Sequence, residues 1–126
     1  MKTLLTLLAL LAPLAALGCN SGTPLEAPQT VPVKGKVLLP DGQPLKQGRL
    51  VLVPIDKSKQ EANGLLGKDG AFTLMSYKPG DGAAPGEYKV KLEDAPAGVP
   101  KKYLSGAGET VTVSADKSDY TIKLTN

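Results

Sequence analysis

The stretch that decides the fold is residues 87–93, Glu-Tyr-Lys-Val-Lys-Leu-Glu, in which charged and apolar residues alternate without a break. A period of two is typical of a β-strand that has one face buried and one face in water. We therefore expect Tyr88, Val90 and Leu92 to point into a core and their charged neighbours to point outward. A shift by one residue would expose all three apolar side chains, so the register of this strand is strongly specified.

Similar strand signals recur on both sides of this stretch. Arg49–Ile55 is a nearly continuous apolar run, which is typical of a strand covered on both faces. Asp-Gly pairs at 41–42 and 69–70 lie between apolar runs and predict tight reversals of the chain. The remaining strand segments are 31–39, 72–74, 110–114 and 120–124, and we expect the last two to form a closing hairpin.

These signals predict an all-β domain. About seven short strands, separated by turns at intervals of about ten residues, are typical of a two-layer antiparallel β-sandwich. No window offers an amphipathic helical stripe of useful length. We expect Gly42, Gly70 and Gly86 to supply turn conformations, Phe72 and Tyr88 to be core rings, and the Tyr88 hydroxyl to bond to backbone at the edge of the sandwich.

Composition limits both size and chemistry. The chain has 126 residues, and the part that follows the leader described below has the length of one domain. The formal charge of +3 comes from scattered lysines, which does not favour nucleic acid as a partner. Histidine is absent, which excludes imidazole catalysis and leaves a zinc site without its common ligand. No serine lies in a nucleophile context and the acidic residues lack calcium-loop spacing, so we expect no enzyme, metal or cofactor.

The amino-terminal segment has the profile of an export signal. Lys2 gives a short positive start, and residues 3–16 form an uncharged run rich in leucine and alanine. This run is shorter than the roughly 20 apolar residues that a spanning helix needs. It is followed at once by Gly18 and by Cys19, the only cysteine in the chain. We therefore expect a helical signal peptide rather than a membrane span.

Residues 14–19, Leu-Ala-Ala-Leu-Gly-Cys, resemble the lipobox of bacterial lipoproteins. The resemblance implies cleavage before Cys19 and lipidation of that cysteine, with palmitate among the acyl chains. The alternative is an ordinary secretory leader followed by an incidental free cysteine. The predicted organisation is a lipoprotein signal peptide over 1–18, a flexible tether rich in proline and small residues over 19–30, and the β-sandwich domain over 31–126.

Several segments of the domain resemble carboxypeptidase regulatory-like domains, and the tail resembles small lipoproteins of planctomycete-type bacteria. The matching segments are Gly35-Lys36-Val37, Asp41-Gly42-Gln43-Pro44-Leu45, Gly48, Leu50-Val51-Leu52, Asp69–Leu74 and Pro85–Val90, with Val99–Tyr103 and Thr110–Leu124 in the tail. The resemblance implies a transthyretin-like (prealbumin-like) sandwich. Such a domain accompanies carboxypeptidases but is not itself the peptidase. The related hydrolase of 5-hydroxyisourate relies on histidines, which this chain lacks.

The expected function is therefore non-catalytic. We expect a cell-envelope lipoprotein, facing the periplasm or the cell exterior, whose domain is structural or binds a carbohydrate or protein. The alternative is an accessory subunit of a secreted hydrolase or envelope complex. Lys101, Lys102 and Tyr103, in the long loop 95–108, form the one local grouping of two cations with an aromatic ring, and are candidates for binding a glycan or an envelope protein. The alternative for them is a solvated loop with Tyr103 tucked beneath it.

Overall fold

The computed structural model describes residues 29–126, so the expected signal helix over 1–18 and most of the tether over 19–30 lie outside the described residues. The described part is essentially all β, which confirms the expected class. Its elements in chain order are β1 (Lys34–Leu38), β2 (Arg49–Pro54), β3 (Ala62–Leu65), β4 (Ala71–Thr73), β5 (Gly86–Glu93), α1 (Lys101–Leu104), β6 (Thr110–Val113) and β7 (Asp119–Lys123).

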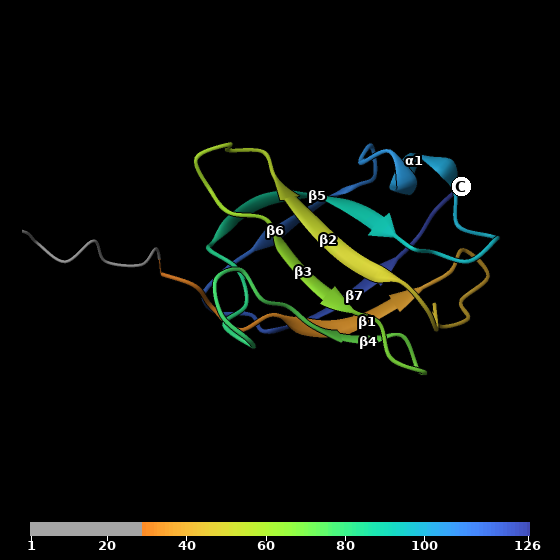
Figure 1. Cartoon of the computed structure of the whole chain (residues 1–126), viewed down its shortest axis with the longest axis horizontal. Helices are drawn as coiled ribbons and strands as arrows, with labels where there is room; N and C mark the ends of the chain where they lie inside the picture. Colours follow the sequence, from red (N-terminus) through yellow and green to blue (C-terminus); the bar gives the residue numbers. More distant parts are fainter. Residues whose placement is uncertain (1–28) are drawn as a thin grey trace, which may run out of the picture.

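The strands form two sheets that share one core (Figure 1). The three-stranded sheet has the order β4-β1-β7, and the four-stranded sheet has the order β3-β2-β5-β6. The apolar side chains of β5 that the alternation predicted to point inward are buried. Tyr88 and Val90 are 0% exposed and Leu92 is 1% exposed. They pack in one cluster with Val37 and Ile122 from the other sheet. Burial of this shared apolar face is the main force that holds the two sheets together.

Two expectations about strand pairing are wrong. The segments around β6 and β7 do not form a hairpin, because β6 pairs with β5 while β7 joins the other sheet. There β7 pairs with β1 in parallel, with Lys34 opposite Asp119, so the sheets are not antiparallel throughout. The connection between Val113 and Asp119 carries the chain from one sheet to the other. Local alternation identifies a strand but not its partner, which is why the hairpin was the wrong inference.

One strand gave no usable sequence signal. Ala62-Asn63-Gly64-Leu65 forms β3 at the edge of the four-stranded sheet, although asparagine and glycine are depleted in strands. The structure explains the glycine, because a Cβ atom on Gly64 would run into the carbonyl oxygen of Thr73 in the next part of the chain. Asn63 also exchanges backbone hydrogen bonds of 2.9 Å with Met75, which follows β4. These bonds join the two sheets on the side of the domain where β3 and β4 lie.

Other expectations about single residues are confirmed. Phe72 is 4% exposed and lies in the core cluster. The Tyr88 hydroxyl donates a hydrogen bond to the carbonyl oxygen of Ala84, as expected for a ring whose polar end lies at the edge of a sheet. Gly42 and Gly70 have φ values of 90° and 77°, which side chains with a Cβ atom rarely adopt. These residues therefore have structural roles.

The single helix of the described region is short. Helix α1 has four residues and packs against β5. It is too short to produce an amphipathic stripe in the sequence, which is why periodicity did not reveal it. None of the helices in residues 29–126 has the length and apolar character needed to cross a membrane. The described chain begins at one end of the domain, whereas α1 lies at the other end (Figure 1). Val31, close to this beginning, bridges to Ala83.

Candidate functional site

The sequence-derived candidate residues lie on α1, and their side chains have different environments. Lys101 is exposed, Lys102 is half-buried and Tyr103 is fully buried. The Tyr103 ring packs against the backbone of Gly108, where an added Cβ atom would lie 2.6 Å from Cδ1 of the ring. The ring therefore anchors the 95–108 loop to the domain, as the structural alternative for this loop expected. Its face is not available to stack on a ligand.

A polar cluster ties α1 to the end of the chain. The Tyr103 hydroxyl donates a hydrogen bond to the carboxylate of Glu109 and accepts one of 2.8 Å from the backbone N–H of Thr125. Lys102 Nζ lies 2.9 Å from Glu109 Oε1, forming an ion pair, and 2.9 Å from Thr125 Oγ1. The Thr125 hydroxyl also donates to the Glu109 carboxylate. Each polar end of these side chains is thus already engaged within the domain.

The cluster shifts the protonation equilibria of its charged members. Partial burial raises the pKa of Glu109, but hydrogen bonds from Thr125, Tyr103 and Lys102 outweigh this effect and lower it from 4.5 to about 2. The hydrogen bond to Glu109 is the main reason that the pKa of Lys102 is raised. Both groups remain charged at neutral pH, so they form an ion pair there.

The three candidates therefore do not form one binding surface. Lys102 is paired with Glu109 and its ammonium lies 5.2 Å from the centre of the Tyr103 ring. The exposed side chains of α1 are those of Lys101 and Leu104. Leu104 is 46% exposed. The ligand-binding role of Lys101, Lys102 and Tyr103 stays a prediction, and of the three only Lys101 has an exposed side chain.

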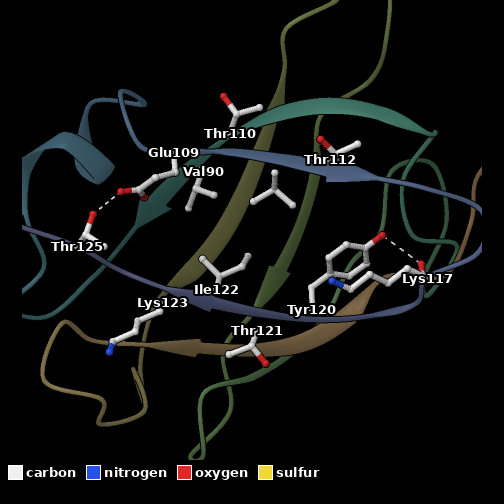
Figure 2. Close-up of a pocket in the computed structure, with 11 residues that line it drawn as sticks. Val90, Glu109, Thr110, Thr112, Lys117, Tyr120, Thr121, Ile122, Lys123 and Thr125 are labelled. Carbon is white, nitrogen blue, oxygen red and sulfur yellow. Dashed lines mark hydrogen bonds between the residues drawn. The ribbon is translucent and has the colours of Figure 1, made fainter.

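A more favourable site lies between β6 and β7. Here the two sheets leave a groove of about 330 Å³, which is at the lower end of the volumes that ligand sites have. Figure 2 shows Val90 and Ile122 pointing into the space between the strands. Thr110 and Thr112 follow β6 along one rim, and Thr121 lies on the β7 side. The groove is therefore apolar at its base, and the threonine side chains of the two bordering strands point away from the space between them (Figure 2).

Each end of the groove is held by interactions already within the domain. At one end the Tyr120 hydroxyl donates to the carbonyl oxygen of Lys117 and accepts a hydrogen bond from the backbone of Ser114. Lys117 Nζ lies 4.8 Å from the centre of the Tyr120 ring. At the other end stands the Glu109 and Thr125 part of the polar cluster (Figure 2). These contacts fix the positions of the two strands that border the groove.

No family model, curated protein or solved structure matches the chain. The resemblance to carboxypeptidase regulatory-like domains therefore rests on the residues quoted for it. Within residues 29–126, no group of three or more histidine, cysteine, aspartate or glutamate side chains is placed to hold a metal ion. The groove was missed by sequence reasoning because its two strands were expected to pair with each other, and a paired hairpin would leave no space between them.

Proposed function

We propose that this chain is a lipoprotein of the bacterial cell envelope, attached to the membrane through lipid on Cys19. The observation that carries the proposal is that the only cysteine directly follows an uncharged apolar leader and a small residue. Each buried methylene contributes about 0.8 kcal/mol, and two or more acyl chains give a stable anchor. Cys19 would thus be a site of attachment and not a nucleophile.

The geometry of the domain is compatible with such an anchor. Eleven residues separate Cys19 from Val31, where the chain first pairs with the domain through Ala83. An extended chain of this length reaches at most about 40 Å. The described chain begins at the end of the domain opposite α1 (Figure 1), so such a tether would join the domain at the end far from α1.

We propose for the domain itself a non-catalytic structural or binding role on a transthyretin-like sandwich. The seven strands in two sheets and the hydrogen bond from the Tyr88 hydroxyl to Ala84 support this fold family. Among the described residues, Tyr88, Tyr103, Tyr120 and Phe72 are all buried, and Tyr77 is the one exposed aromatic ring, at 47%. Sugar rings stack on exposed aromatic faces. Of the two partner classes, protein is therefore favoured over carbohydrate.

The anchor is tested by intact-mass analysis of membrane fractions from a Gram-negative host. The natural chain is expected to begin at Cys19 and to carry added acyl mass, and Cys19→Ala is expected to lose both the added mass and the membrane attachment. Ser21→Ala, two residues further on, is the matched control and should be processed like the natural chain. An unacylated, soluble natural chain would refute the anchor, and Cys19 would then be a free exported thiol.

A further inference from the structure

The groove between β6 and β7 is bordered by two strands that are neighbours in sequence but are not paired. Only the connection between Val113 and Asp119 separates them, yet β6 ends one sheet and β7 ends the other. On the opposite side of the domain the sheets are joined by the bridge between Asn63 and Met75. The β6 and β7 side is therefore the open side of the domain, and both of its strands are edge strands.

Within residues 29–126, both strands direct backbone groups that have no partner strand toward this open side. Successive residues of a strand turn their N–H and C=O groups to opposite edges. In β6, Glu109 accepts a hydrogen bond from Val90 of β5, so Thr110 and Thr112 direct their backbone groups away from β5. In β7, Ser118 and Leu124 bond to β1, so Thr121 and Lys123 direct theirs away from β1.

The side chains of β6 give this edge no protection against pairing. Exposed edge strands usually carry lysine, proline or a bulge, which discourage the addition of another strand. Strand β6 reads Thr-Val-Thr-Val, and all four residues are β-branched and uncharged. Val111 packs partly against the core. This edge is consequently well suited to accept another strand.

We infer that the groove binds an extended peptide segment of a partner protein, which adds to β6 as a further strand. The inference deepens the proposed binding role and rests on it. Four residues, or about 13 Å of extended chain, would match the length of β6. Backbone hydrogen bonds would supply affinity, and alternate side chains of the peptide would lie over Val90 and Ile122.

The charges along the groove favour an acidic segment. Lys117 and Lys123 line it, whereas the one carboxylate that lines it, Glu109, is paired with Lys102. The groove therefore offers net positive charge to an incoming chain. Acidic residues at the ends of the peptide would meet these lysines, which favours association and fixes the direction of the bound strand.

A free peptide and a second copy of this domain differ in the number of unpaired strand edges that each can offer to the groove. A free extended segment has two unpaired edges, so it can bond to β6 on one side and approach β7 on the other. The β6 strand of a second copy already uses one edge for its own β5. It could therefore satisfy only one border of the groove, which makes a free segment the better occupant.

The test uses the full chain in detergent micelles and a capped hexapeptide of alternating valine and threonine with an aspartate at each end. Amide hydrogen exchange is followed by NMR. On addition of the peptide, the amides of Thr110 and Thr112 are expected to exchange at least about tenfold more slowly. The amide of Val111, which belongs to the β5 and β6 ladder, serves as an internal reference. The same peptide with an N-methyl group on every residue, which removes the N–H donors from both of its edges, should give no protection.

Two substitutions at one position separate strand addition from other modes of binding. Thr112→Pro removes a backbone donor that faces the groove and leaves the ladder with β5 intact, because proline is tolerated on the free side of an edge strand. It should weaken peptide binding about tenfold. Thr112→Val has nearly the same shape, keeps the N–H group and should bind like the natural chain. Replacing both Lys117 and Lys123 by glutamine should weaken binding, whereas Lys46→Gln, on the exposed loop before β2, should not.

The outcomes either support the inference or overturn it. Protection confined to the groove-facing amides, lost with the N-methylated peptide and with Thr112→Pro, supports it. Equal binding of the two peptides, or no protection at all, overturns it. Protection that appears without peptide and grows with protein concentration assigns the edge to a second copy and also overturns it. Cys19→Ala should bind the peptide normally, so failure of the anchor and failure of the groove are separate results.

Discussion

The hydroxyl of Tyr88 lies 2.6 Å from the carbonyl oxygen of Ala84, to which it donates a hydrogen bond. The ring is 0% exposed, and burial raises the pKa of its hydroxyl above the ordinary value of 10.0, with a further contribution from Tyr77. The bond joins a side chain near the start of β5 to the segment that precedes this strand. This contact fixes where β5 begins.

Removal of that hydroxyl should therefore destabilise the fold. Tyr88→Phe keeps the ring but leaves the Ala84 carbonyl without its donor, and we expect it to lower the free energy of unfolding by about 1 to 3 kcal/mol. Tyr77→Phe is the matched control, because Tyr77 is 47% exposed, and it should change stability by less than about 0.5 kcal/mol. Urea unfolding of both variants measures the difference. Equal stability of the two would contradict a structural role for the Tyr88 hydroxyl.

The lowered pKa of Glu109 predicts a loss of stability in acid. A carboxyl group with a folded-state pKa of about 2, against an ordinary value of 4.5, favours folding while it is ionised. This contribution is fully present above pH 4.5 and is lost as the pH falls toward 2. Glu109→Gln should be less stable than the natural chain at pH 7, and the difference should shrink as the pH falls through this range.

Thermal unfolding between pH 7 and pH 2 tests this expectation. Glu61→Gln, at an exposed position before β3, is a suitable control. Three other carboxyl groups have lowered pKa values, because hydrogen bonds to them outweigh the opposing effect of burial: those of Asp56, Asp81 and Asp116. The natural chain and the variants will therefore all lose some stability in acid. The informative quantity is the difference between the natural chain and Glu109→Gln. A difference that stays constant with pH would argue against the lowered pKa.

The close approach of Gly64 to Thr73 predicts that position 64 does not tolerate a side chain as small as a methyl group. Gly64→Ala would place a Cβ atom against the Thr73 carbonyl oxygen, and we expect a loss of about 1 to 3 kcal/mol from the forced shift of β3. At Gly67 the nearest atom to an added Cβ atom lies 3.6 Å away, which is ordinary contact. Gly67→Ala should therefore be tolerated. Denaturant unfolding that ranks the two variants in the reverse order would contradict the described packing of β3.

Sequence alternation predicted individual strands well where one face is buried and the other is wet. The clearest case is β5, whose inward residues Tyr88, Val90 and Leu92 are all buried as expected. Long-range pairing did not follow from the same signal. The partner of β7, the last strand in the sequence, is β1, the first strand. No local pattern marks that pairing.

The candidate site was harder to predict because it depends on tertiary structure. The grouping of Lys101, Lys102 and Tyr103 is visible in the sequence, but the partners of Lys102 and Tyr103, namely Glu109 and Thr125, are distant enough to escape a local pattern. The groove between β6 and β7 exists only because the two strands belong to different sheets. Identifying it from sequence would have required knowledge of which strands pair.

The parallel pairing of β1 with β7 also bears on the order of folding. Lys34 lies opposite Asp119, so β1 stays without one of its two neighbours until the last strand of the domain has been made. Pairing across such a long loop carries a closure cost and slows folding. A chain that is exported as proposed would thus resist premature folding during synthesis and stay in a form that can be translocated, and its three-stranded sheet would close only after the whole domain had crossed.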